Sequence, residues 1–451
     1  MIARIVAPVV LAASSLFSSY DVLPLQLKAP FNDLFDRART DDSYAVTGTL
    51  SYDARGQRVT VDGVRITLRG NTSRRDSECA FPKLKVQFPD DNRPDAFGGL
   101  ASIKIGTHCG EAPDDGVTVK FGRLPNEHSP VREVFVYRLL ETLDVPSLKA
   151  RQAAMTYVYT DGKPGQTPPQ DRPLVRQAMI VEDTEAAIKR YGGKRGIDEK
   201  AFSNARAQFT AADTARLTLA EALIGNFDWC LKMTPGDTYR CDARHPLWNV
   251  AVAVAASGAA RPIMNDFDVA GIVTGHHPWF NDVFNAAFAP SKSAAETEVL
   301  AQVQRTRTLF GRAELDAARA EFVRRKTDAY RVLDEASLDA VGRTIARQYL
   351  DAFYRAIESD DAFYRPVVTA TDARLYATGN RDVVCSAAGP IPPGTPVSEP
   401  LQTRGTLMQV LILDALWHWA PPAKCPAVHA GPVWIETSAV SRNYPNSAIK
   451  N

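Results

Sequence analysis

The chain has 451 residues, of which 45% are hydrophobic and 23% charged, a composition typical of a globular protein with more than one hydrophobic core. Its 53 Lys and Arg residues are balanced by 52 Asp and Glu residues, so the formal net charge is +1. This balance leaves no excess of positive charge to attract a phosphate backbone, and it argues against a nucleic-acid-binding role.

Residues 1–20 have the layout of a secretory signal peptide. A single Arg4 precedes a mainly apolar run from Ile5 to Phe17, with small residues near its end. An N-terminal strand or helix of the core is the alternative interpretation. The run is shorter than the roughly 20 residues of a transmembrane helix, so we expect no membrane span in the mature chain.

The chain contains six cysteines, an even number that is typical of disulfide-bonded exported proteins. We therefore expect a secreted or periplasmic protein. Six cysteines allow about 15 pairings, and the sequence alone does not choose among them. We expect pairing between cysteines that are close in the sequence: Cys79 with Cys109, Cys230 with Cys241, and Cys385 with Cys425.

Residues 44–123 are expected to be rich in β-structure. From Val64 to Leu68 apolar and polar residues alternate, which is the period of a half-buried strand. A second alternating run, Leu84 to Phe88, follows a polar turn. In this run Lys83 and Lys85 lie on the face opposite to the apolar residues.

The first long helix is predicted over Val131 to Leu143, where Glu133 shares a helical stripe with apolar residues. Further strands are predicted at 153–159 and 174–182. From about 197 to 365 the chain is expected to be mostly helical, and the segment 293–365, rich in Ala, Arg, Glu and Leu, predicts two or three packed helices.

Residues 366–445 contain short β-forming runs separated by turn signals, a pattern that predicts a small barrel or sandwich. Gly389-Pro390-Ile391-Pro392 and the later Gly431-Pro432-Val433-Trp434-Ile435 resemble a bacterial SH3-like domain. A β-structured cap of no particular family is the alternative.

Two acidic motifs carry the chemistry that the sequence suggests. Asp228 lies between aromatic residues where a predicted helix ends, an environment in which a carboxylate can accept a proton. Asp266 and Asp268 follow the strand-like segment Val250 to Ile263 and precede the strand-like Ile272-Val273. Carboxylates two residues apart can present oxygen ligands to Mg²⁺ or Mn²⁺, although each Asp by itself is more often a turn or cap residue.

The order of the polar residues strengthens this interpretation. A strand lysine (Lys85) and a helix glutamate (Glu133) precede Asp228, and Asn249 lies between Asp228 and Asp266. Protein kinases present a phosphate-binding lysine, its glutamate partner, a catalytic aspartate, a metal-binding asparagine and a metal-binding aspartate in the same order.

Over roughly residues 60–275 the chain resembles the spore coat protein H (CotH) kinase-like family and its exported relatives in Gram-negative bacteria. The resemblance rests on these motifs: Arg69-Gly70-Asn71-Thr72-Ser73-Arg74, Cys79-Ala80-Phe81-Pro82-Lys83-Leu84-Lys85, Arg132-Glu133, Gly225-Asn226-Phe227-Asp228-Trp229, and Asp266-Phe267-Asp268 followed by Gly271.

The resemblance implies an α+β, two-lobed atypical protein-kinase-like fold. We expect a kinase-like domain over 25–365, with a β-rich N-lobe to about 180 and a mainly helical C-lobe over 181–365. The separate resemblance of the C-terminal motifs predicts a small all-β SH3-like domain over 366–445. It also implies roles for individual residues: Arg69 to Arg74 near the nucleotide phosphates, Lys85 as the phosphate-binding lysine with Lys83 as a competitor, Glu133 as the partner of that lysine, Asp228 as the catalytic base, Asn249 and Asp266 as metal ligands joined by Asp268, and Glu182 as a nucleotide contact.

Two departures from the family pattern concern the metal site. Relatives have His-Asn where this chain has Trp248-Asn249, with His245 nearby, and Asp228 and Asn249 are much farther apart than in a kinase catalytic loop. A disulfide between Cys230 and Cys241 would close off much of the insertion and return Asn249 to the site.

The expected function is phosphate transfer from ATP, with Mg²⁺ or Mn²⁺, to a protein or another acceptor of the cell envelope. A catalytically silent exported scaffold is the alternative, in which the SH3-like domain binds cell-wall peptide, peptidoglycan or a protein partner. A third hypothesis keeps the nucleotide site and transfers AMP instead of phosphate.

Overall fold

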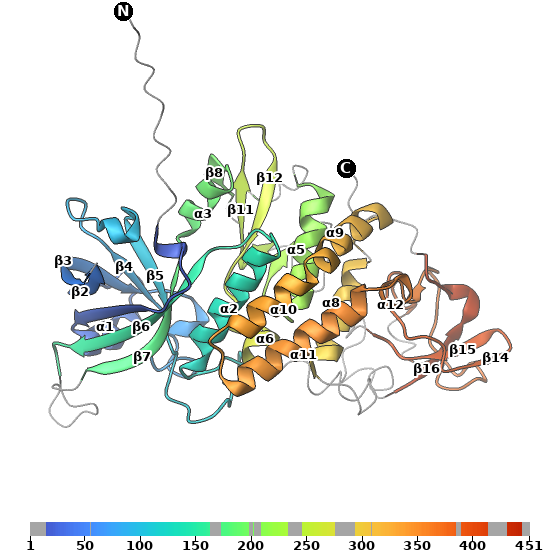
Figure 1. Ribbon diagram of the computed structural model, residues 1–451. Coiled ribbons are helices and arrows are strands. Elements are labelled where there is room, and N and C mark those ends of the chain that lie inside the picture. The colour runs from blue at the N-terminus through green and yellow to red at the C-terminus, as the bar shows by residue number, and fades with distance from the viewer. Residues whose placement is uncertain are drawn as a thin grey trace, which may run out of the picture. The chain divides into compact units, whose positions relative to one another are not determined.

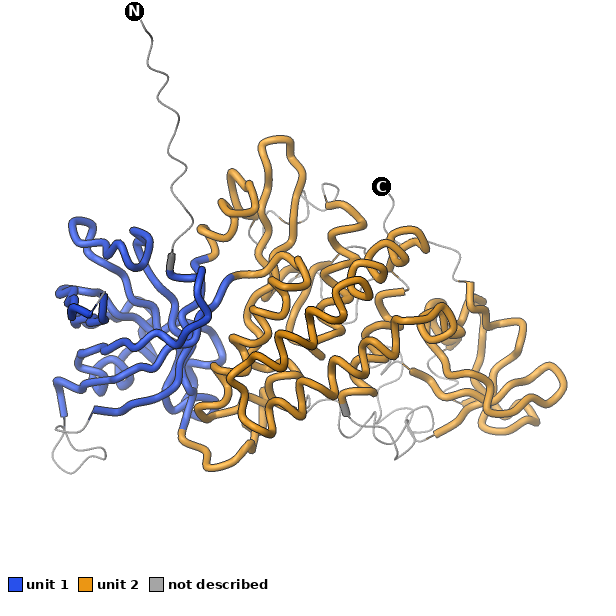
Figure 2. Tube along the Cα trace, viewed as in Figure 1, with its two compact units in different colours: residues 1–110, 149–183 blue, residues 111–148, 184–451 orange. Residues whose placement is uncertain are grey.

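The computed structural model describes residues 15–54, 56–162, 173–197, 202, 209–232, 246–275, 294–307, 309–384, 389–413 and 431–443 (Figure 1). The chain divides into two compact units, residues 1–110 with 149–183, and residues 111–148 with 184–451 (Figure 2). The fold mixes helices and sheets. Within the described ranges, no helix is long and apolar enough to span a membrane.

The first unit is built on a closed seven-stranded barrel. Its strands run in the order β1, β2, β3, β4, β5, β7, β6, and only the pair β1 and β6 is parallel. The strands are β1 (Leu23–Ala29), β2 (Val46–Ala54), β3 (Gln57–Leu68), β4 (Leu84–Gln87), β5 (Ser102–Gly106), β6 (Ala150–Tyr159) and β7 (Leu174–Val181), and helix α1 (Phe31–Ala38) follows β1.

The alternation seen in the sequence explains the barrel strands. Val64 and Ile66 of β3 and Leu84 and Val86 of β4 are fully buried in the barrel core, as predicted. Burial of one face of each strand also sets the pairing register, because a slip of one residue would expose every apolar side chain. The predicted disulfide between Cys79 and Cys109 is confirmed.

The second unit holds most of the helices. It contains α2 (His128–Thr142), α3 (Thr184–Arg190), α5 (Ala211–Leu223), α6 (Gly271–Thr274), α8 (Ala294–Arg307), α9 (Arg312–Arg324), α10 (Lys326–Glu335), α11 (Ala340–Ile357) and α12 (Asp360–Phe363). Its short strands before α6 are β8 (Arg195–Gly196), β9 (Cys230–Leu231), β10 (Leu247–Trp248), β11 (Val250–Val254) and β12 (Ala260–Met264). Residues 111–148, expected in the β-rich lobe, make their contacts with this unit.

Two elements of this unit differ from the sequence-based expectation. Ile272-Val273 forms part of the short helix α6 and not a strand. The segment 293–365 forms more helices than the two or three predicted, because α9 gives way to α10 at Arg325, and Asp339 and Ser359 cap the starts of α11 and α12. Such caps divide a run of good helix formers without any proline.

The C-terminal part of the second unit is rich in β-structure. It contains β13 (Val367–Val368) paired with β17 (Val440–Ser441), and a three-stranded sheet of β14 (Gln402–Arg404), β15 (Leu407–Val410) and β16 (Val433–Glu436). Apolar side chains from residues 368 to 440 form a separate small core. The predicted β-structure of this segment is therefore present, whereas an SH3-like arrangement is not established by these elements.

Candidate functional site

The loop that carries Asp228 is fixed by hydrogen bonds at its base. Helix α5 ends at Leu223, and the chain turns at Gly225, whose φ is +61°. The Asn226 side chain, fully buried, donates to Glu221 Oε2 at 2.8 Å and accepts from the backbone N–H of Asp228 at 3.0 Å. The backbone at Asp228 is thus set by a buried amide and a buried carboxylate.

A short antiparallel ladder brings Asn249 to Asp228. Trp248 of β10 pairs with Cys230 of β9, so the next residue, Asn249, lies beside the loop that ends at Asp228. Asn249 Nδ2 donates to the Asp228 backbone oxygen at 2.6 Å and to Asp228 Oδ2 at 3.0 Å. The long insertion is therefore closed by strand pairing, and the unusual spacing does not separate the two residues.

The predicted bridge to Cys241 concerns the same insertion. Cys230 is disulfide-bonded, whereas Cys241 and His245 lie outside the described residues, as do Cys385 and Cys425.

A second hairpin brings Asn249 to the Asp266 segment. In the β11–β12 pair Val250 lies opposite Met264, so Asn249 and Asn265 are neighbours, and the Asn265 N–H donates to the Asn249 oxygen at 3.4 Å. Asn249 (φ +50°) and Asp266 (φ +64°) both adopt the left-handed backbone conformation, which Asn and Asp tolerate better than other non-glycine residues. These two residues flank the same β11–β12 hairpin, and strained backbone of this kind concentrates at functional sites.

Helix α2 holds the Asp266 segment from the other side. Tyr137 Oη accepts a hydrogen bond from the Asp266 N–H at 3.1 Å, and Glu133 Oε1 accepts one from the Phe267 N–H at 3.1 Å. The Tyr137 and Phe267 rings are in contact, with centroids 4.8 Å apart. The contact that the structure shows for Glu133, predicted as the partner of a lysine, is thus this hydrogen bond to the segment that carries Asp266.

Asp268 forms a buried ion pair. Its Oδ2 accepts from Arg123 Nε at 2.9 Å, and the two side chains are only 7% and 8% exposed. A buried pair of this kind is expensive to break, because removal of one partner leaves a buried charge without compensation. Asp268 thus anchors residues 266–268 to the segment that precedes α2.

The Asp228 loop and the Asp266 segment are also joined directly to each other. The Gly271 N–H donates to the Gly225 oxygen, and the Ile272 N–H donates to the Ile224 oxygen, each at 3.0 Å. Beneath them the buried Tyr349 hydroxyl donates to Glu298 in a short hydrogen bond. A Cβ atom on Gly225 or Gly271 would overlap Tyr349, so both positions require glycine for close approach.

Helix α2 is anchored within the second unit by Arg132, whose side chain is 1% exposed. Its guanidinium donates to Asp115, to the Val273 oxygen and twice to Asp339. Burial acts to raise the pKa of the Asp339 carboxyl, but the hydrogen bonds from Arg132 and Gly342 and the Arg132 charge outweigh it, and the pKa lies below its ordinary value.

The remaining predicted site residues belong to the first unit. Lys85 lies on β4 directly opposite Lys104 of β5. Lys83 is mostly buried, contrary to its expected place on the exposed face, and its backbone oxygen accepts from the Arg69 N–H at 2.9 Å. Glu182 Oε2 accepts from the Lys149 N–H at 3.1 Å.

The turn predicted to approach nucleotide phosphates borders an open pocket of about 400 Å³ in the first unit. Arginines contribute to its lining, and two of them are paired with acidic residues, Arg39 with Asp76 and Arg74 with Asp42. The pocket is lined by Arg39, Asp42, Gly70, Asn71, Arg74, Arg75 and Asp76.

The structure thus brings together the five predicted residues of the second unit: Glu133, Asp228, Asn249, Asp266 and Asp268. The predicted pairing of Lys85 with Glu133 joins the two units and stays a prediction. Among the residues that the structure describes, no group of three or more His, Cys, Asp or Glu side chains is arranged to hold a metal ion.

Sequence reasoning missed several residues that support this site, namely Arg123, Tyr137, Glu298 and Tyr349. Tyr137 is one residue of the predicted helix Val131 to Leu143, and Glu298 lies in the segment 293–365, for which the sequence predicted only packed helices. No local pattern marks a buried glutamate that meets a tyrosine of a distant helix.

Comparison with known proteins adds little to this description. No protein-family model and no curated protein sequence matches the chain. A crystal structure of a Helicobacter pylori proinflammatory kinase, CtkA, aligns with 60% of this chain and 90% of its own, at 11% sequence identity and a TM-score of 0.29. Similarity at this level does not establish a common fold.

Proposed function

We propose that the chain is a nucleotide- and metal-dependent phosphotransferase whose second unit carries the catalytic carboxylate and the metal ligands. Two contacts carry this proposal: the side chain of Asn249 donates to Asp228, and the backbone of Asn249 accepts from Asn265, the residue before Asp266. Two hairpins join the segments that carry these polar residues, and hydrogen bonds to the backbone hold them in place. Such preorganised polar groups are what phosphoryl transfer needs.

Asn249 fits the role of a metal ligand. Its Nδ2 is committed to Asp228, which fixes the orientation of the amide, and its Oδ1 accepts no hydrogen bond from the described residues. An amide oxygen and a carboxylate oxygen are ligands that Mg²⁺ accepts, and Mg²⁺ is commonly held by one or two carboxylates together with the phosphates of its substrate. We therefore assign the metal contact to Asn249 and Asp266.

Asp228 is then the group that receives the proton of the acceptor hydroxyl. Its hydrogen bond from Asn249 orients the carboxylate, and its backbone is locked by Asn226. When bound, the metal would neutralise charge on the transferred phosphoryl group. Asp268, paired with Arg123, keeps the segment in position.

The first unit is proposed to bind the phosphates of ATP through Lys85, with Arg69 and the turn that follows it. The confirmed disulfide supports an oxidising location, secreted or periplasmic, and so a protein or another envelope component as acceptor. An SH3-like contact of residues 366–445 with peptidoglycan belongs to the same proposal.

Titration calorimetry with ATP and Mg²⁺ tests the proposal. We expect saturable binding to the parent, binding at least tenfold weaker in Asp266→Ala, and unchanged binding in the control Asp91→Ala, an exposed turn residue of the first unit. Asp228→Ala should bind ATP but form no product. Absence of binding to the parent, or equal binding by Asp266→Ala, would contradict the proposal and favour the scaffold alternative, and the product mass separates phosphate from AMP transfer.

A further inference from the structure

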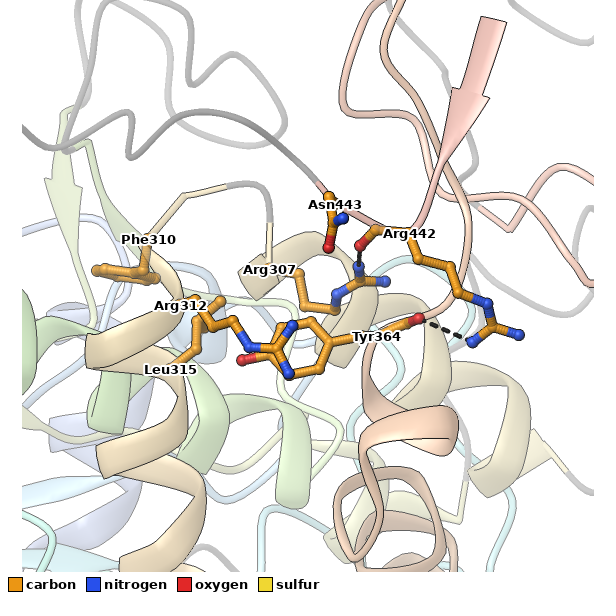
Figure 3. Close-up of a pocket in the computed structure, with 7 residues that line it drawn as sticks. All are labelled: Arg307, Phe310, Arg312, Leu315, Tyr364, Arg442 and Asn443. Carbon is orange, nitrogen blue, oxygen red and sulfur yellow. Dashed lines mark hydrogen bonds between the residues drawn. The ribbon is translucent and has the colours of Figure 1, made fainter. Parts of the chain in front are cut away.

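A small pocket in the second unit lies where the end of α8 meets the C-terminal strands. Its volume is about 70 Å³, the scale of a single small polyatomic group. The described residues that line it include three arginines and no carboxylate, as Figure 3 shows. The pocket is lined by Arg307, Phe310, Arg312, Leu315, Tyr364, Arg442 and Asn443.

Arg307 is a buried cation without an acidic partner among the described residues. It is 2% exposed. Its guanidinium donates to Gln304 Oε1 and to the Arg365 oxygen, each at 2.6 Å, and to the Arg442 oxygen at 3.2 Å, all of which are neutral acceptors. Nε, also buried, makes no hydrogen bond within the described structure.

Because its hydrogen-bond acceptors are all neutral, the positive charge of Arg307 is not balanced by a negative group among the described residues. Burial lowers the pKa of the guanidinium to about 10, and the charges of neighbouring arginines act in the same direction, while Tyr364 opposes them. Burying a charge is costly unless it is paired. A pocket whose inner wall carries such a charge favours an anion.

The other two arginines lie at the exposed side of the pocket. The Arg312 guanidinium stacks over the Tyr364 ring, 4.2 Å from its centroid, and also reaches Asp360 at 2.7 Å. Arg442 reaches Glu399 at 2.7 Å. Both arginines are about half exposed, and ion pairs in such positions are worth little, so either guanidinium can turn toward a ligand at small cost.

We propose that this pocket binds one tetrahedral oxyanion, a phosphate or sulfate group, between Arg312 and Arg442 and in the field of Arg307. Guanidinium groups match the oxygens of such anions in bidentate geometry, which explains why arginine and not lysine supplies all three cations. Because Arg307 belongs to α8 and Arg442 follows β17, the bound anion would tie the helices to the C-terminal strands.

Thermal unfolding of the full chain, together with titration calorimetry, tests this proposal. Inorganic phosphate and sulfate are each titrated against sodium chloride at matched ionic strength. We expect a saturable rise in Tm and saturable binding for at least one of them, with affinity about tenfold weaker in Arg312→Gln. The control Arg324→Gln changes an exposed arginine at the other end of the same helix and should bind like the parent.

Arg307→Gln is not used alone, because its lost hydrogen bonds would also affect folding. Phosphate and sulfate stabilise many proteins by exclusion from the surface, but that effect is not saturable and would be equal in Arg312→Gln. Such an equal effect would overturn the proposal. The Asp266→Ala variant should bind the anion like the parent, so this test of the pocket is independent of the proposed phosphotransferase function. If anion binding were lost in Asp266→Ala and kept in Arg312→Gln, the anion would bind at the proposed metal site, and the pocket proposal would be overturned.

Discussion

Replacement of Gly225 by alanine should reduce the stability of the second unit and disturb its proposed metal site. The residue has φ +61°, and a left-handed conformation costs an alanine about 1–2 kcal/mol. An added Cβ would also lie 3.1 Å from Glu298 Oε2 and from Tyr349 Cζ, and closer still to another carbon of the Tyr349 ring. Tyr349 is fully buried and hydrogen-bonded, so it has little room to move.

The expected loss in the free energy of unfolding is the sum of the backbone cost and the overpacking cost. Overpacking of a buried site costs about 1–3 kcal/mol, so the total for Gly225→Ala is about 2–5 kcal/mol. Gly258 provides a matched control, because its φ of +88° carries the same backbone cost but no atom lies within 4 Å of an added Cβ. Gly258→Ala should therefore lose only about 1–2 kcal/mol.

The two variants are compared by urea unfolding with a probe in the second unit, and the midpoints are converted at a common slope. ATP binding in the presence of Mg²⁺ is measured in parallel. Gly225→Ala should weaken binding, because displacement of Tyr349 disturbs the hydrogen bond from the Gly271 N–H to the Gly225 oxygen that joins the two halves of the site. Equal losses of stability in the two variants would refute the packing argument.

Two further predictions concern single interactions. Asp339→Asn should cost about 1–2 kcal/mol at pH 7, since it weakens the charged hydrogen bonds to Arg132. The Asp339 pKa is lowered in the folded state, so this stabilisation is complete above about pH 4 and is lost as pH falls further. Urea unfolding at pH 7 and pH 3 should therefore show a smaller difference in unfolding free energy between parent and variant at the lower pH. Replacing Cys79 and Cys109 by alanine should lower the free energy of unfolding of the first unit by about 3–4 kcal/mol, because the disulfide closes a loop with a sequence separation of 30. Thermal unfolding measures the effect, and an unchanged Tm would show that the unfolded state is not constrained by this bridge.

The sequence by itself was sufficient for the features that depend on neighbouring residues. Alternation predicted β3 and β4 because one face of each strand is buried, and the stripe that includes Glu133 predicted α2. The short separation of Cys79 and Cys109 also led to the correct pairing. For the strands and the helix the information is local, since a strand or helix repeats every two or 3.6 residues.

Only the tertiary structure decided which polar residues meet. Asn249 reaches Asp228 and Asn265 because two hairpins have particular registers, whereas the sequence offered only a disulfide between Cys230 and Cys241 as a way to close the insertion. The buried contact between Glu298 and Tyr349 and the arginine pocket around Arg307 likewise join segments that are distant in the chain. Such contacts arise from the packing of whole elements, and packing is set by shape and burial in three dimensions, which a local pattern does not contain.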